Sequence, residues 1–440
     1  MRAVTLAFLC FALPAAAQDL RQVYRDAKAY DALYAAARYA LQAGLEKLPQ
    51  GRALILPTLG LTSSAVSTRI DSYSRNSILP PGLRDIHSYG YSISFSQPIY
   101  RPQNMLQYDQ AEFQVRQAEA TFGQSAQDLI VRTAQAYFDV LAAQDTLALV
   151  QAQKAAISEQ LAQAKRNFEV GTATITDTHE AQARFDLSAA QEIAAQSDLE
   201  TKRRALQQIT GKEYAVLRPL RPEVKLTPPN PANMQAWVDI AEKQGYPVQI
   251  QESATEIAGL EAKRNAAGHL PTVDLVASYG TTSQTGSTVI ATAGSGVITT
   301  GVVGLQFALP LYQGGAISSR ERETAALYSR SKQDLENARR SQALTARQTY
   351  LSVTNGIAQV GALEQALVSS QSALDSNKLG YEVGVRINID VLNAQQQLFS
   401  TRRDLAVARY NTITSHLRLK AAAGSLREED LEEVNRALQP

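Results

Sequence analysis

The sequence repeats itself once, with a shift of about 213 positions, and this duplication limits the folds open to it. Five landmarks recur at that spacing: Leu56-Pro57-Thr58-Leu59 and Leu270-Pro271-Thr272-Val273, Phe95-Ser96-Gln97-Pro98-Ile99-Tyr100 and Phe307-Ala308-Leu309-Pro310-Leu311-Tyr312, Tyr137 and Tyr350, Val170-Gly171 and Val383-Gly384, and Gly211 and Gly424. A single long-period repeat of this kind indicates two tandem copies of one structural unit, and not a short-period solenoid.

Each copy is expected to contain the same elements: a helix, two strands joined by a polar loop, a very long helix, a bend and a last helix. The first copy, 18–211, has helices expected at 20–48, 104–169 and 177–209 and strands at 54–68 and 88–99; the second copy, 246–424, has helices expected at 246–267, 317–382 and 390–422 and strands at 272–282 and 297–311. A proline-rich connector with a short helix around Trp237, 212–245, lies between them, and 425–440 form a tail.

The strands are typical of a sheet with one apolar face. Tyr89, Tyr91, Ile93 and Phe95 alternate with glycine and serine, and the other strands repeat the pattern. Strict alternation places one face against apolar surroundings, and runs of about 10 residues match a tilted outer-membrane strand. A half-buried soluble sandwich is the alternative. Four strands are too few for a membrane barrel, which needs about eight, so several chains would have to share one.

The two long helices extend well beyond a membrane. About 65 residues at a rise of ~1.5 Å give a rod of ~100 Å, whereas a bilayer core is only ~30 Å thick. Ala and Gln are abundant in these segments, which suits mutually packed helices. A closed ring of such rods would form a tube, and an elongated coiled-coil spacer is the alternative.

The Val-Gly pairs 170–171 and 383–384 mark the bends between long helices. Glycine supplies the backbone freedom that ends a helix. Asp177 and Asp390 follow just inside the next helix, where a carboxylate caps free N–H groups. Each copy therefore predicts a helical hairpin.

The first 17 residues are typical of a secretory signal peptide. Arg2 precedes an apolar run, and Ala15-Ala16-Ala17 is a cleavage site, so the mature chain would start at Gln18. Cys10, the only cysteine, would be removed with it. No later stretch approaches the ~18 apolar residues of a membrane helix.

No catalytic or metal-binding pattern is apparent. The four histidines fall in unrelated elements, there is no Walker-type loop, and 43 Lys+Arg balance 42 Asp+Glu. The sequence predicts no enzyme, no cofactor and no nucleic-acid partner, so any transport would be powered by other proteins. With three methionines in all, a dedicated copper duct is disfavoured.

Over nearly its whole mature length the sequence resembles the TolC family of outer-membrane efflux and secretion channels. The resemblance is carried by the tandem repeat and by five segments: Thr133-Ala134-Gln135-Ala136-Tyr137-Phe138, Ile175-Thr176-Asp177, His269-Leu270-Pro271-Thr272, Leu309-Pro310-Leu311-Tyr312-Gln313-Gly314-Gly315 and Tyr381-Glu382-Val383-Gly384. It implies a mainly α fold with four transmembrane strands per chain. It also implies a homotrimer with a twelve-stranded barrel in the outer membrane and a long helical tunnel in the periplasm.

The resemblance also implies roles for the residues at the bends. Thr176, Asp177, Tyr381 and Arg386 match positions that link neighbouring hairpins in the closed state, although simple helix capping is equally open for Asp177. Asp390 matches a pore-facing aspartate, and Asn393 stands where the family has a second one, which predicts weaker cation selectivity and weaker block by multivalent cations. The residues that match the adaptor-docking tips are Val170, Gly171, Thr172, Val383, Gly384 and Val385; plain helix termination is the alternative.

The function expected from these features is a passive outer-membrane exit duct for efflux or type I secretion. Its expected partners are a periplasmic adaptor, an inner-membrane pump or ABC transporter, and outer-membrane lipid. A non-conducting scaffold or adhesin is the alternative of a different class. The cargo, whether drugs, metal ions or secreted proteins, does not follow from this chain.

Overall fold

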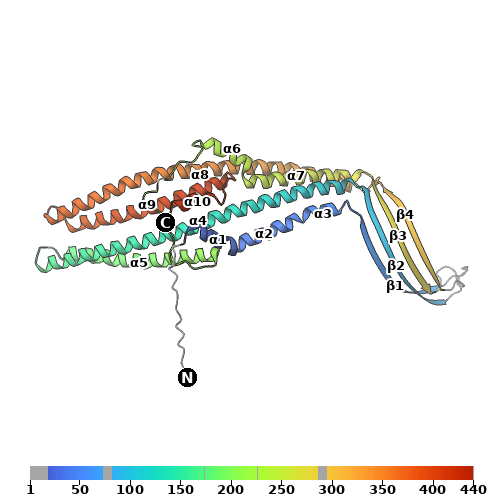
Figure 1. Cartoon of the computed structure of the whole chain (residues 1–440), viewed down its shortest axis with the longest axis horizontal. Coiled ribbons are helices and arrows are strands. Elements are labelled where there is room, and N and C mark those ends of the chain that lie inside the picture. Colours follow the sequence, from blue (N-terminus) through green and yellow to red (C-terminus); the bar gives the residue numbers. More distant parts are fainter. Residues whose placement is uncertain (1–17, 73–81, 173, 225, 286–294, 440) are drawn as a thin grey trace, which may run out of the picture. The chain divides into compact units, whose positions relative to one another are not determined.

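A computed structural model describes residues 18–72, 82–172, 174–224, 226–285 and 295–439 (Figure 1). The predicted signal peptide and the tips of both strand-joining loops lie outside these residues. The described residues divide into two compact units. One, here called the helical unit, comprises the described residues of Met1–Tyr39, Ala120–Gln249 and Asn337–Pro440; the other, the sheet unit, comprises those of Ala40–Glu119 and Ile250–Glu336. Each unit takes segments from both repeats.

The order of elements agrees closely with the duplication. The bounds are α1 Leu20–Tyr30, α2 Ala32–Leu45, α3 Lys47–Ala53, β1 Thr58–Ser72, β2 Gly82–Tyr100, α4 Pro102–Glu169, α5 Ile175–Thr210, α6 Met234–Gln244, α7 Tyr246–Ala266, a 3-10 turn Ala267–His269, β3 Thr272–Thr285, β4 Gly296–Ala308, α8 Ala316–Glu382, α9 Asn388–Ala422 and α10 Asp430–Arg436. The predicted long helices are confirmed as α4 and α8, with 68 and 67 residues.

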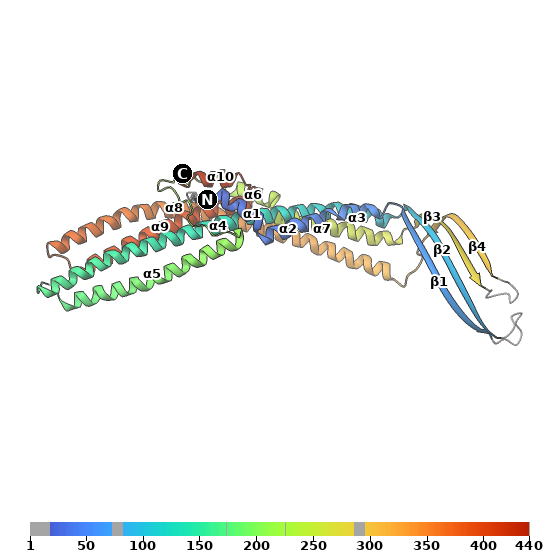
Figure 2. The same cartoon turned by 60° about the horizontal axis from the view of Figure 1, so that its bottom comes forward.

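The four strands form one antiparallel sheet in the order β1-β2-β3-β4, side by side in both views (Figures 1 and 2). The pairing of β2 with β3 joins the two repeats. The register sets Phe95 opposite both Leu59 and Ala277, and Ile93 opposite Tyr279. Because opposite residues share a face, the apolar positions predicted from alternation come together on one side of the sheet.

The apolar face of the sheet is uncovered in the single chain. Leu59 is 75% exposed, Val303 79% and Leu305 69%. Soluble monomers rarely expose a continuous apolar surface of this kind, which marks contact with a membrane or a partner. The sheet therefore needs apolar surroundings that the chain does not itself provide.

An ion pair ties the sheet to the start of α4 within the sheet unit. Arg101 donates two hydrogen bonds to the Asp274 carboxylate, from Nε at 2.8 Å and from Nη2 at 2.6 Å. Asp274 on β3 is buried. A paired guanidinium and carboxylate fix both distance and orientation, so this contact sets how the long helix leaves the strand.

The single helix expected at 20–48 is wrong, because three short helices occupy that segment. Asp31 ends α1, and its carboxylate accepts a hydrogen bond of 2.7 Å from the backbone N–H of Tyr34 in the first turn of α2. Pro49 lies in the first turn of α3, where a missing N–H costs nothing. Local side-chain capping and proline chemistry therefore override the continuous periodic pattern.

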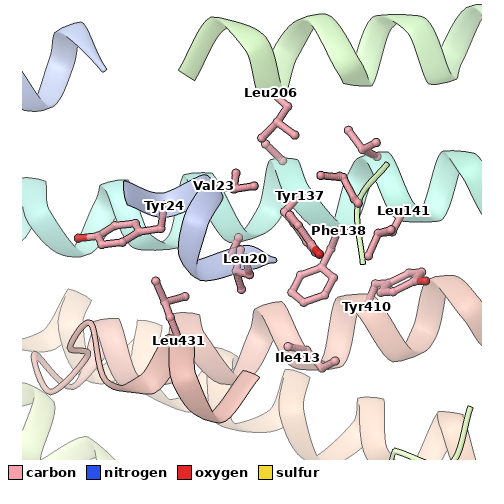
Figure 3. Packing of buried hydrophobic residues seen from close by; sticks show 14 of the residues in the cluster. Leu20, Val23, Tyr24, Tyr137, Phe138, Leu141, Leu206, Tyr410, Ile413 and Leu431 are labelled. Atoms are coloured by element: carbon pink, nitrogen blue, oxygen red, sulfur yellow. The ribbon is translucent and has the colours of Figure 1, made fainter. Parts of the chain in front are cut away.

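The main core of the helical unit lies where the two repeats meet (Figure 3). It contains Tyr137 and Phe138 of α4, both almost fully buried, and Tyr410 of α9. The Phe138 and Tyr410 rings stack with centroids 5.5 Å apart, and the Tyr137 hydroxyl donates to the Arg218 carbonyl at 2.8 Å. The motif at 133–138 is thus a packing motif that also holds the connector.

The connector and the tail are more ordered than their composition suggests. Two isolated bridges pair Gln18 with Leu217 and Leu220 with Leu438. The segment expected to be a tail contains α10, and Lys420 of α9 binds Asp430 at 2.9 Å and Glu433 at 3.2 Å. The short helix predicted around Trp237 is confirmed as α6.

A hydrogen bond between the repeats gives a first prediction. The Tyr410 hydroxyl donates to the Asp145 carboxylate at 2.7 Å, and burial raises the pKa of Asp145 while this bond opposes the rise. Tyr410→Phe leaves a half-buried carboxylate unpartnered, so we expect a loss of about 1–3 kcal/mol, measured as a lower melting temperature in detergent. Tyr350→Phe is the matched control, because the Tyr350 hydroxyl bonds to no described residue. Equal melting temperatures for the two variants would contradict the assignment.

His416 gives a second prediction, on pH. It lines a cavity of about 190 Å³ beside α10. Burial lowers the pKa of His416, Lys420 lowers it further, and Glu433 and Asp430 oppose this. A folded-state pKa below the unfolded value of ~6.5 favours the folded state above that pH, and this contribution is lost as the pH falls. We expect the melting temperature to fall between about pH 7.5 and 5.5, and to fall less in His416→Gln; parallel curves would contradict this.

Candidate functional site at the hairpin ends

The end of the first hairpin is the bend between α4 and α5, which lie side by side in both views (Figures 1 and 2). Val170 N–H donates to the Arg166 carbonyl at 3.1 Å and Thr172 N–H to the Asn167 carbonyl at 2.8 Å. Gly171 between them has a φ of 78°. These bonds satisfy the last carbonyls of α4, as in helix ends that use a left-handed glycine.

The end of the second hairpin, between α8 and α9, has the same construction. Gly384 has a φ of 80°, and the N–H groups of Val385 and Arg386 both donate to the Gly380 carbonyl, at 2.9 and 3.0 Å. A Cβ added at Gly171 or Gly384 would meet no atom within 4 Å. The glycines are therefore needed for backbone conformation, and the predicted hairpin bends are confirmed.

The tips of both hairpins expose apolar side chains. Val170 is 72% exposed, Val383 65% and Val385 76%. Thr172 is also exposed, and its hydroxyl bonds back to the Asn167 carbonyl. Three exposed valines around two exposed glycines form a surface on which another protein can pack closely.

The two helices that leave the bends start differently. Thr174 is the N-cap of α5, with a capping box in which the Asp177 carboxylate accepts from the Thr174 backbone N–H at 3.0 Å. Ile387 is the N-cap of α9 and offers no side-chain cap. Capping by Asp177 is confirmed in this form, whereas capping by Asp390 is wrong.

The Asp390 carboxylate instead lies 3.6 Å from the Arg386 guanidinium, one turn away. Both side chains are partly exposed, so the pair is worth well under 1 kcal/mol within one chain. The structure thus brings two predicted site residues together, Arg386 and Asp390. Because their ion pair is weak, either side chain can bind another partner instead. Thr176 is exposed, and its hydroxyl bonds to no described residue.

Near the bends, Asn167 and Arg184 make polar contacts that connect the two hairpins. Asn167 of α4 donates to the Tyr381 hydroxyl of α8 at 3.1 Å. Arg184 of α5 donates to Gln396 Oε1 at 2.6 Å and to Asn393 Oδ1 at 3.0 Å, both on α9. Tyr381 and Asn393 were predicted as site residues, whereas Asn167, Arg184 and Gln396 were missed. Their partners are more than 200 positions away, and polar side chains on amphipathic helices carry no signal of such a contact.

The apolar side chains of α9 near these polar contacts pack against both the first hairpin and α8. Leu392 belongs to an apolar cluster with Ile157, Leu161 and Ala181 of the first hairpin. Val391 and Leu398 pack with Leu374 of α8. Residues three and four apart share a helix face, so Asp390, Asn393 and Gln396 form a row on α9 that is at least partly exposed to solvent.

Buried polar atoms without partners also occur near the bends. Among the described residues they include the Asn388 amide, Gln395 Oε1, Gln160 Oε1 and Thr178 Oγ1. Among the described residues no group of three or more His, Cys, Asp or Glu could hold a metal ion, and no helix is long and apolar enough to cross a membrane.

Comparison with known proteins gives one family. The family model described as "Outer membrane efflux protein" matches residues 23–212 and 248–425, which are the two repeats. Among curated relatives, the outer membrane protein TolC of Vibrio cholerae serotype O1 is 34% identical over 96% of this chain and 94% of its own length. The alkaline protease secretion protein AprF of Pseudomonas aeruginosa is 32% identical over 93% of this chain and 85% of its own.

Among solved structures, the outer membrane protein VceC of Vibrio cholerae superposes with a TM-score of 0.78. The match covers 92% of this chain and 96% of that one, at 19% identity. This likeness concerns the fold, and it covers both the sheet and the helical hairpins.

Proposed function

Because the chain belongs to the outer membrane efflux protein family, we propose that it is the exit duct of a tripartite efflux or type I secretion system, passive and opened at its periplasmic end by partner proteins. Its relatives are outer-membrane channel proteins, and it is an outer-membrane protein with a helical tunnel in the periplasm. We propose how this protein assembles, how its channel opens and which partners it binds.

The observation that carries the proposal is the uncovered apolar sheet with two open edges. In the described sheet β1 and β4 each pair on one side only. An unpaired strand edge in lipid costs several kcal/mol per group, so the edges must pair with other chains. Three chains would supply twelve strands, an even number within the range of outer-membrane barrels.

The hairpin ends supply the mouth of the duct. In a threefold ring, Asp390 and Asn393 would line the constriction. Thr176, Asp177, Tyr381 and Arg386 would link neighbouring hairpins, alongside the intrachain contact of Tyr381 with Asn167. Hydrogen bonds of this kind contribute about 0.5–3 kcal/mol each, so a ring of them can hold a mouth shut and still be opened by a partner.

The exposed tips at Val170, Gly171 and Thr172 and at Val383, Gly384 and Val385 would dock a periplasmic adaptor. The adaptor would connect the duct to an inner-membrane pump or ABC transporter, which supplies the energy. The curated relatives include proteins named for efflux as well as proteins named for protease secretion, so the cargo would follow from the partners. A scaffold or adhesin with the same sheet is the rival function.

Conductance separates the two functions. Purified protein added to a planar bilayer should produce discrete channels of low conductance, because the mouth is closed at rest. Asn167→Ala removes the donor to Tyr381, so we expect a higher conductance or more frequent open events. Gln163→Ala on the same helix is the control, since its side chain bonds to no described residue. A preparation of trimers with no conductance would favour the scaffold.

Adaptor docking is tested at Gly384. Its φ of 80° disfavours L-residues with a Cβ by about 1–2 kcal/mol, but Asn tolerates that conformation. We expect Gly384→Leu to abolish crosslinking in vivo between the tip and an adaptor, and Gly384→Asn to retain most of it, with trimers intact in both. Loss of the trimer in Gly384→Leu would indicate that the glycine only ends the helix.

A further inference from the structure

Arg184 places a positive charge on the face of α9 that carries Asp390 and Asn393. Its guanidinium bridges Asn393 Oδ1 and Gln396 Oε1, which lie one turn apart. Because these two residues belong to the partly exposed row of α9, the guanidinium lies on that row as well. A sequence reading of α9 alone misses this charge, since it comes from α5.

The Arg184 charge is not neutralised within the chain. Among the described residues no carboxylate lies within ion-pair distance of its guanidinium, and its two acceptors are neutral amides. By contrast, the Asp390 carboxylate has Arg386 beside it at 3.6 Å. Each chain therefore presents Asp390 and Arg184 at this row, with Arg386 just before α9 and beside Asp390, and the three charges sum to +1.

The position of Arg184 is fixed by packing. Its side chain is half-buried and lines a small pocket with Ile157, Leu187 and Leu392. Two hydrogen bonds to separate acceptors use the planar fork of the guanidinium. Both the aliphatic part of the Arg184 side chain and its guanidinium are therefore held in place, so the position of the charge is fixed.

We propose that Arg184 determines the ion selectivity of the duct by forming a cationic ring at the closed constriction, which favours anionic solutes. The proposal rests on the proposed function, because it needs three chains around one pore with Asn393 facing the lumen. Charged rings of one sign set selectivity in narrow pores, with Arg and Lys rings favouring anions. Asn393 then serves as a support that orients the guanidinium, and the ring charge is positive where two aspartates would make it negative.

The test is the reversal potential of the purified trimer in a planar bilayer under a potassium chloride gradient. We expect the wild type to prefer chloride or to be nearly unselective, and Arg184→Gln to lower the chloride-to-potassium permeability ratio by roughly threefold to tenfold at low salt. Arg184→Lys keeps the charge but loses the two-pronged contact, and should stay close to the wild type. Arg204→Gln, about 30 Å further along α5, is the charge-matched control and should change nothing.

The variants distinguish an effect of the Arg184 charge on selectivity from a structural role of Arg184 as a contact between the hairpins. If Arg184→Lys and Arg184→Gln change selectivity equally, Arg184 acts as a strut between hairpins and the proposal is overturned. If Arg184→Gln conducts with the wild-type permeability ratio, the charge does not face the pore and the proposal is overturned, while the exit-duct function stands. If the wild type itself makes no channels, the proposed function fails and the inference falls with it.

Discussion

The unsatisfied backbone of a four-stranded sheet is the constraint on which the rest of this structure depends. β1 and β4 each leave one edge unpaired, and the face that carries Leu59, Val303 and Leu305 has no cover in the chain. An apolar face requires apolar surroundings, and an edge in such surroundings requires another strand. The sheet therefore accounts for the membrane location and supports the proposed assembly from further copies of the chain.

The helices follow from how the sheet is built. Each hairpin of strands is drawn from one repeat, so each repeat must leave the sheet through its own long helix, α4 or α8. The contact of Arg101 with Asp274 fixes the first of these exits. Further along, the two repeats share a core at Phe138 and Tyr410. The duplication thus provides two similar rods per chain, and α9 packs against both: against α4 at Phe138 and against α8 at Leu374.

The sequence predicts the periodic elements well and the contacts between them poorly. The strands and the long helices follow from alternation, length and the 213-residue shift, because these patterns reflect burial of whole faces. The prediction of one continuous helix at 20–48 is wrong because the carboxylate of Asp31 caps a second helix, α2. The helix α10 within the tail was not predicted, because it is held by Lys420, whose carboxylate partners are only recognisable once the chain is folded. At the site, the glycine bends were predictable from local chemistry, whereas the contacts of Arg184 and Asn167 join positions more than 200 residues apart.

The ends of the hairpins bury several polar atoms that have no partner among the described residues, and this suits the proposed duct, whose mouth would have to open. Around Tyr137 the apolar side chains are fully buried. Near the bends, Gln160, Thr178, Asn388 and Gln395 bury polar atoms that find no partner within the described chain. Each such group costs about 1–3 kcal/mol when it stays unpaired, so the hydrogen bonding at the hairpin ends of a single chain is incompletely satisfied. Neighbouring chains or a docking partner can supply the missing hydrogen bonds, and the arrangement in which they do so is the one that will be populated. In the proposed duct, a mouth with such a polar interior could therefore be opened by partners at small cost, while the core around Tyr137 stays intact.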